Sequence, residues 1–119
     1  MGNESLVSAE AILKLHKLGG DGLVRDLMEI FLRDTPPRLS EARAATARRD
    51  LNRVAREVHP LRSSAGNMGV TKVFELAGKI EEAAYRNDLA VIEPLLPELE
   101  KAYAEALPQL EAIRQKGNI

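Results

Sequence analysis

The chain has no cysteine and no tryptophan, and phenylalanine, tyrosine and tryptophan together make up only 3% of its residues. The absence of cysteine excludes a disulfide framework and a thiolate metal site, and it fits a reducing compartment. The formal net charge is −1, whereas a nucleic-acid-binding chain would favour a basic face with stacking rings. No apolar run approaches the length of a membrane span, and neither a signal peptide nor a myristoylation pattern is visible. We therefore expect a cytoplasmic protein that binds neither nucleic acid nor membrane.

The length and the spacing of apolar residues predict the fold class. At 119 residues the chain is the size of one domain, which we place over residues 1–119 with a core at about 8–113. No segment alternates apolar and polar residues with period two, so no strand is predicted. Apolar residues instead recur at three and four positions. This pattern predicts an all-α fold, an antiparallel four-helix bundle with a short additional N-terminal helix.

Capping and breaking residues place the first helices. Ser8 is a suitable N-cap for a short helix that Gly19-Gly20 would end, with an apolar face made of Ala9, Ile12, Leu13, Leu15 and Leu18. Asp21 can cap the next helix, which Pro36-Pro37 interrupts because two backbone donors are missing there. Either one long helix bends at the prolines, or Thr35 caps a separate helix with Pro36 at its first position.

Three further helical segments follow. The first begins at Asp50 and ends at Gly69, and the second runs from about Thr71 to Arg86, where Asn87-Asp88 break it. The inner face of the second segment is predicted to hold Val73, Phe74, Ala77, Ile80 and Ala84. The last segment has an unbroken apolar seam at positions 89, 92, 96, 99, 103, 106, 110 and 113, and its three prolines lie off that seam.

His59 lies on the polar side of its predicted helix. At 3.6 residues per turn its apolar neighbours centre roughly 130° away from it; they are Val54, Val58, Leu61, Ala65 and Met68. Arg62, Ser63 and Gly66 share the side of His59, and Asn52, Ala55 and Arg56 extend that side through the preceding turns. The pattern predicts an exposed imidazole among mostly small side chains, which suits chemistry with a large partner.

The segment around His59 resembles the signature of histidine-containing phosphotransfer (HPt) domains, His-x-Leu-Lys-Gly-Ser-x-x-x-ψ-Gly with ψ apolar. The matching residues are His59, Leu61, Arg62, Ser63, Ser64, Met68 and Gly69. Similarity extends through residues 18–21, 31–36 and 79–88, so it covers the chain from about Ser8 to Leu110. Arginine replaces the usual lysine at position 62, and serine replaces the frequent glycine at position 63. The resemblance favours a single bent helix across the prolines.

The resemblance implies that His59 receives a phosphoryl group from a receiver-domain aspartate and passes it to another receiver. It implies that Arg62 offsets the charge of the phosphoryl oxygens and that Glu81 accepts a hydrogen bond from the second imidazole nitrogen. Receivers would dock on Asn52, Ala55, Arg56, Ser63 and Gly66, while Leu61, Ser64, Met68 and Gly69 would be structural. The expected partners of this monomer are response-regulator receivers, with a hybrid sensor kinase as a further candidate. No cofactor is expected, since magnesium would sit on the receiver, and no ATP-binding motif indicates kinase activity.

Other interpretations of these residues stay open. A lone histidine on a helix is usually a surface residue, and Arg62 and Glu81 could be solvated charges. His16 has no partner at metal-ligand spacing and is interpreted as structural or surface. Pro60, Arg62 and Ser63 depart from the family pattern. An alternative is therefore a helical scaffold that binds receivers or a kinase without phosphotransfer. The phosphoacceptor domain of a larger hybrid or chemotaxis-type kinase is another.

Overall fold

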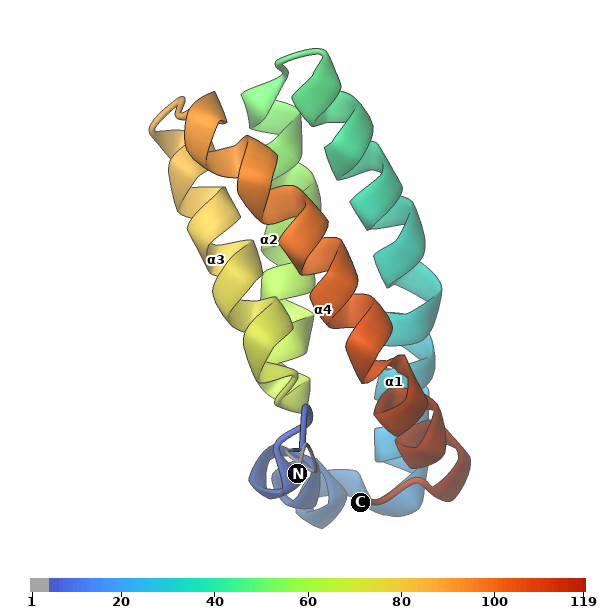
Figure 1. Ribbon diagram of the computed structural model, residues 1–119. Coiled ribbons are helices and arrows are strands. Elements are labelled where there is room, and N and C mark those ends of the chain that lie inside the picture. Colours follow the sequence, from blue (N-terminus) through green and yellow to red (C-terminus); the bar gives the residue numbers. More distant parts are fainter. Residues whose placement is uncertain (1–4) are drawn as a thin grey trace.

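Four antiparallel helices make up the computed structural model, which describes residues 5–119 (Figure 1). They are α1 (Ala9–Ala47), α2 (Leu51–Met68), α3 (Thr71–Tyr85) and α4 (Leu89–Lys116). Each helix packs on the next in the chain, and α4 packs back on α1, so the bundle closes. The described residues contain no strand. The predicted all-α bundle is confirmed.

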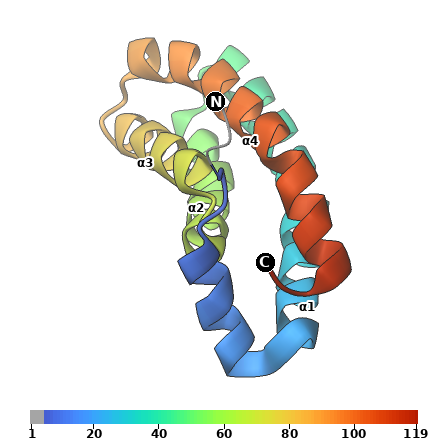
Figure 2. The same ribbon diagram turned by 60° about the horizontal axis from the view of Figure 1, so that its bottom comes forward.

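The first part of α1 is an N-terminal arm (residues 9–19) that leaves the axis of the rest of the helix at Gly20. Gly20 has φ 68° and ψ −163°, which are not helical dihedrals and which glycine tolerates because it lacks Cβ. Figure 2 shows the arm running from beside the α2–α3 connection to this kink, where the chain turns into the long part of α1. The short additional N-terminal helix is thus present as the arm, with Ser8 as its N-cap accepting from the Ala11 amide.

The long part of α1 continues through both prolines. Gly20 is the one residue inside α1 with non-helical dihedrals, so Pro36 and Pro37 lie within a single helix. Thr35 is 2% exposed, and its hydroxyl donates to the Phe31 carbonyl at 2.6 Å, one turn back. This is a backward bond inside a helix and not an N-cap. The alternative in which Thr35 starts a separate helix is therefore wrong.

Short connections join the other helices and fix their ends. The carboxylates of Asp50 and Asp88 cap α2 and α4 by accepting from the backbone amides three residues later. Gly69 ends α2 in the left-handed region, with φ 71°. Its carbonyl accepts the Ser8 amide at 2.8 Å, so the end of α2 is tied to the start of the arm.

The core agrees with the predicted apolar faces of α2 and α4, but Phe74 of α3 and three predicted inner residues of the arm, Ala9, Leu13 and Leu18, lie outside it. Phe74 is 37% exposed because it points about 100° away from the buried Val73 around α3, to the edge of the helix interface. Leu13 and Leu18 of the arm are 46% and 79% exposed, since the arm buries only the narrow stripe that contains Ile12. Among residues 5–119, no helix combines the length and the apolar character that crossing a membrane requires.

Candidate functional site

The helical phase of α2 places His59 on the outside of the bundle. Its side chain is 60% exposed, while Val58 and Leu61 on either side of it are buried in the core. Pro60 lies inside α2 and supplies no amide for the Arg56 carbonyl one turn back, yet the helix continues to Met68. The imidazole is therefore accessible and anchored on a rigid element.

The carboxylate of Glu81 on α3 is the centre of a hydrogen-bonded cluster beneath the imidazole. His59 Nδ1 lies 2.6 Å from Glu81 Oε2, and the Tyr85 hydroxyl donates to the same oxygen at 2.8 Å. The guanidinium of Arg62 donates to the other oxygen, Oε1, at 3.2 Å. The side chain of Glu81 is only 4% exposed. A buried carboxylate of this kind needs such donors to offset its lost hydration.

These contacts determine the protonation state of Glu81. Burial raises the pKa of this carboxyl, but the hydrogen bonds from Tyr85, His59 and Arg62 together outweigh burial and bring the pKa below its usual value. An ionised carboxylate can only accept, so His59 Nδ1 carries the hydrogen and donates it. The lone pair of the ring is then on Nε2, which has no hydrogen-bond partner among residues 5–119.

Arg62 contacts the Glu81 carboxylate and an aromatic ring rather than extending freely beside the imidazole. Its guanidinium carbon lies 5.4 Å from the centre of the Phe74 ring, within the range of a cation–π contact. Gly78 allows this position, because a Cβ there would come within 3.2 Å of Arg62 Nε. The side chain remains 44% exposed. Arg62 is thus a counter-charge for Glu81 that also faces solvent one turn from His59.

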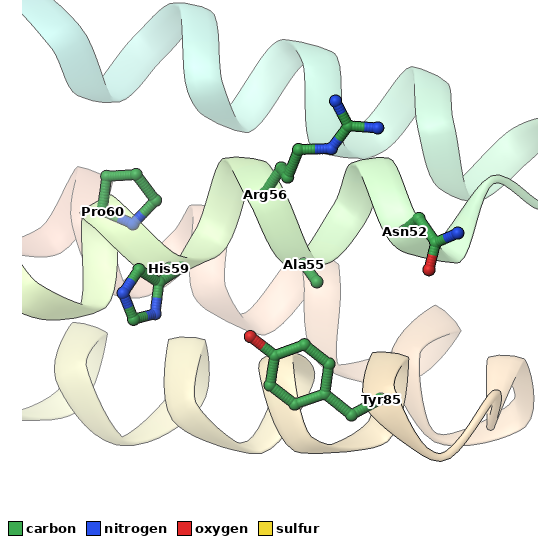
Figure 3. Close-up of a pocket in the computed structure, with 6 residues that line it drawn as sticks. All are labelled: Asn52, Ala55, Arg56, His59, Pro60 and Tyr85. Atoms are coloured by element: carbon green, nitrogen blue, oxygen red, sulfur yellow. The ribbon is translucent and has the colours of Figure 1, made fainter.

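An open depression of about 490 Å³ lies beside the imidazole (Figure 3). Its lining residues are Asn52, Ala55, Arg56, His59, Pro60 and Tyr85. Asn52 and Arg56 are exposed, as a docking face requires. Ala55 is only 6% exposed, which corrects its expected position on the surface. Figure 3 shows the Tyr85 ring across from Ala55, with its hydroxyl on the side of His59.

Tyr85 is a member of the site that the sequence interpretation missed. It follows Glu81 by four residues, and residues at this spacing lie on the same face of a helix. That spacing was the available signal. A hydroxyl one turn after an expected buried acid on the same helix is in position to donate to that acid.

The remaining motif residues lie along α2 away from the depression. Ser63 and Gly66 are exposed, and Gly66 lies against the Phe74 ring, which a Cβ would approach within 3.0 Å. Gly66 also lines a second hollow together with Leu15 and Leu18 of the arm. The structural motif residues divide by position: Leu61 and Met68 are buried, Ser64 is partly exposed, and Gly69 forms the C-cap.

Outside this site, the second histidine forms a local pair. His16 Nε2 lies 2.5 Å from Asp21 Oδ1, which links the arm to the long part of α1 across Gly20. Its side chain is 33% exposed, which agrees with its interpretation as structural or surface. No group of three or more potential metal ligands occurs in the described part of the chain.

The fold and the site together define an all-helical domain that presents one exposed histidine over a buried acid. The chain matches the Hpt domain family over residues 26–114, most of its length. It therefore belongs to the histidine-containing phosphotransfer family, whose members are phosphoryl carriers of phosphorelays with response-regulator receiver domains as partners.

The fold is shared with a solved member of this class. The structure is similar to the crystal structure of histidine-containing phosphotransfer protein B (HptB) from Pseudomonas aeruginosa PAO1, with a TM-score of 0.84 and 22% sequence identity. The match covers 92% of this chain and 94% of that chain. At this identity the likeness establishes the fold. The comparison with curated proteins found no match.

Proposed function

We propose that the protein is a phosphorelay intermediate that accepts a phosphoryl group on His59 Nε2 from a receiver aspartate and transfers it to the aspartate of another receiver. The observation that carries this proposal is the pairing of an exposed imidazole with a buried carboxylate. Glu81 holds the hydrogen on Nδ1, so the nucleophilic lone pair lies on Nε2. A partner as large as a receiver can reach a nitrogen that stands on the surface of a helix.

The transfer proceeds without proton movement at the ring. The Nε2 lone pair attacks the phosphorus of the aspartyl phosphate, the N–P bond forms, and the P–O bond to the aspartate breaks with its electron pair left on the carboxylate. The ring becomes positively charged while the Nδ1 hydrogen stays in its bond to Glu81, which stabilises that charge. In the second transfer the ring leaves as neutral imidazole. Glu81 therefore serves both directions of the reaction.

The cations of the site fit a receiver that brings negative charge. Arg56 lines the depression beside His59, and Arg62 lies one turn along α2. As a phosphoryl group arrives, its oxygens would compete with Glu81 for the exposed part of the Arg62 guanidinium. Phosphoryl transfer depends mainly on alignment and charge stabilisation. We expect the receiver to supply the magnesium ion, and this chain to act as a monomer without a metal of its own.

Replacement of His59 by glutamine tests this function. Glutamine has no ring nitrogen that can attack phosphorus, so H59Q is expected to lose all labelling by a ³²P-phosphorylated receiver. The helical fold should be retained because the side chain is exposed. The measurement is acid-labile label on the protein after gel separation, with circular dichroism as the check on folding.

The matched control is H16Q, which removes the other histidine of the chain. It should be labelled to the same extent as the unmodified protein. Continued labelling of folded H59Q would contradict the assignment of His59. Binding of the phosphorylated receiver by the unmodified protein, with no label transferred, would favour the scaffold interpretation instead.

A further inference from the structure

Two donors share one oxygen of the buried carboxylate in the site. Glu81 Oε2 accepts from His59 Nδ1 at 2.6 Å and from the Tyr85 hydroxyl at 2.8 Å. A carboxylate oxygen that already accepts one hydrogen bond is a weaker base toward a second donor, since each bond withdraws negative charge from it. The Tyr85 hydroxyl therefore acts on the same atom that orients the imidazole.

We propose that Tyr85 is a positioning residue of the phosphotransfer site, which holds the Glu81 carboxylate in place and limits how strongly Glu81 favours the protonated imidazole. This inference rests on the proposed function of His59 and adds a residue to its machinery. Tyr85 itself is 67% exposed, and its ring forms a wall of the depression beside the imidazole. Its hydroxyl is nevertheless turned toward the bundle, onto an almost fully buried acceptor.

Of the titratable side chains that face His59 or contact Glu81 beneath it, Tyr85 is the one that is neutral, while Glu81, Arg56 and Arg62 are charged. From α3 the imidazole faces Glu81 and Tyr85, and from α2 it has Arg56 in the same depression and Arg62 on the second oxygen of Glu81. No residue of α1 or α4 lines this depression. Next to Glu81, Glu82 is exposed and pairs at 3.7 Å with the exposed Arg86, the residue that follows α3.

On the α1 side of α2, the charged groups pair among themselves. Arg38 of α1 pairs with Glu57, and Glu41 of α1 pairs with Arg53. Glu57 points about 160° away from His59 around the helix. Of the groups facing the imidazole, only Tyr85 can donate to Glu81 without adding a charge. Removal of its hydroxyl should therefore leave the local charges unchanged and free Oε2 for His59 alone.

The direction of the effect follows from this balance. With the hydroxyl absent, more negative charge on Oε2 faces Nδ1, and the imidazolium form gains stability relative to the neutral ring. The neutral ring is the nucleophile. At a given pH below the titration midpoint, the fraction of neutral His59 is therefore smaller without the Tyr85 hydroxyl than with it. The same contact acts on the phenol, because the hydrogen bond to Glu81 raises the pKa of Tyr85.

The test is the NMR titration of His59 in the unmodified protein, in Y85F and in Y103F. Y85F keeps the ring and removes the hydroxyl. Y103F is the matched control, because Tyr103 is the other tyrosine of the chain and packs in the core against Phe31, away from the site. The titration midpoint of His59 should move up by about 0.5 pH unit in Y85F and stay in place in Y103F. An unchanged or lowered midpoint in Y85F would overturn the proposal.

A second readout uses a small donor and needs no receiver. The rate of His59 phosphorylation by phosphoramidate should follow the same shift, so that on the acid side of the profile Y85F reacts about threefold more slowly, as a 0.5-unit shift requires. Coinciding pH profiles would contradict the proposal. A failure of receiver-dependent labelling would affect the proposed function alone, since the titration of His59 does not involve a receiver.

A measurement in E81Q avoids any dependence on the folding of Y85F. If the hydroxyl is bound to Glu81, replacement of that carboxylate by an amide should lower the titration midpoint of Tyr85, followed by the ¹³C signal of its ring. The midpoint of Tyr103 serves as the internal reference. A Tyr85 midpoint that is the same in E81Q and in the unmodified protein would contradict the contact on which the proposal depends.

Discussion

The candidate site is built around a carboxylate that is kept charged inside a helical interface. Glu81 is buried, but a phenol, an imidazole and a guanidinium together donate to both of its oxygens. Removal of any one donor leaves a buried charge less well satisfied, which is the costly situation for such groups. The hydrogen bond from His59 to this carboxylate also selects the imidazole tautomer that carries its hydrogen on Nδ1. Local stability and the proposed chemistry therefore depend on the same cluster of four side chains.

This arrangement predicts an acid-sensitive contribution to stability. Because the hydrogen bonds to Glu81 hold its pKa in the folded protein below the ordinary value of a glutamate, the ionised carboxylate stabilises the fold at pH values above that ordinary value. The contribution is lost as the pH falls through the folded pKa. Urea unfolding should show that E81Q is less stable than the unmodified protein at pH 5, by about 1–2 kcal/mol, and that the difference shrinks at pH 3.

The neighbouring acid provides the control for this measurement. Glu82 is exposed and pairs only loosely with Arg86, so E82Q should change the free energy of unfolding by less than about 0.5 kcal/mol at either pH. A difference between E81Q and the unmodified protein that is constant or grows toward pH 3 would show that the ionised form of Glu81 does not stabilise the fold.

At the scale of elements, α2 is positioned from its C-terminal end as well as by its apolar face. Gly69 closes the helix with φ 71°, and its carbonyl receives the Ser8 amide of the incoming arm. A Cβ on Gly69 would lie 2.6 Å from Ser8 Cβ and 2.7 Å from Ala11 Cβ. The glycine of the family signature therefore serves two purposes here, a left-handed cap and the close approach of the arm.

Substitution of Gly69 by alanine should consequently be destabilising. The strained dihedrals and the contact with the arm together are expected to lower the free energy of unfolding by about 2–3 kcal/mol, measured by urea denaturation. G22A is the opposing control, because Gly22 lies in α1 with open space around it and an ordinary φ. It should raise stability by about 0.5–1 kcal/mol. Equal stability of G69A and the unmodified protein would contradict this account of the cap.

Helical periodicity was sufficient to predict most of the elements and the exposure of His59. The phase of α2 depends only on 3.6 residues per turn, and the apolar seam of α4 is long enough to be unambiguous. Phe74 and Leu18 were placed wrongly because apolar character does not say how wide a stripe each helix interface covers. The Gly19-Gly20 pair was sufficient to predict the break at Gly20. The passage through Pro36 depends on backbone dihedrals and tertiary packing, and there the sequence left two alternatives.

The contacts of the site were only partly accessible from sequence. The resemblance to the HPt signature pointed to Glu81, but the burial of this residue and its third donor, Tyr85, appear only when α2 and α3 are packed together. Arg62 was expected beside the phosphoryl oxygens. Its contact with Glu81 and Phe74 depends on the space left by Gly78, which no pattern in one helix can predict.

The whole molecule presents the His59 imidazole on the outside of a closed bundle. The four helices pack in a ring, and the polar side of α2 leaves one nitrogen of the imidazole facing solvent. Asn52 and Arg56 lie on one side of His59, and Ser63 and Gly66 lie on the other. A receiver that docks on this face would reach Nε2, and Glu81 would hold Nδ1 beneath it.

The position of the phosphoryl group is the most direct test of this account. After the protein has been charged by a phosphorylated receiver, ¹⁵N–³¹P NMR under alkaline conditions identifies the nitrogen that carries phosphorus. We expect a single phosphohistidine at residue 59, with phosphorus on Nε2 and a hydrogen-bonded Nδ1. Phosphorus on Nδ1, or on any residue other than His59, would contradict it.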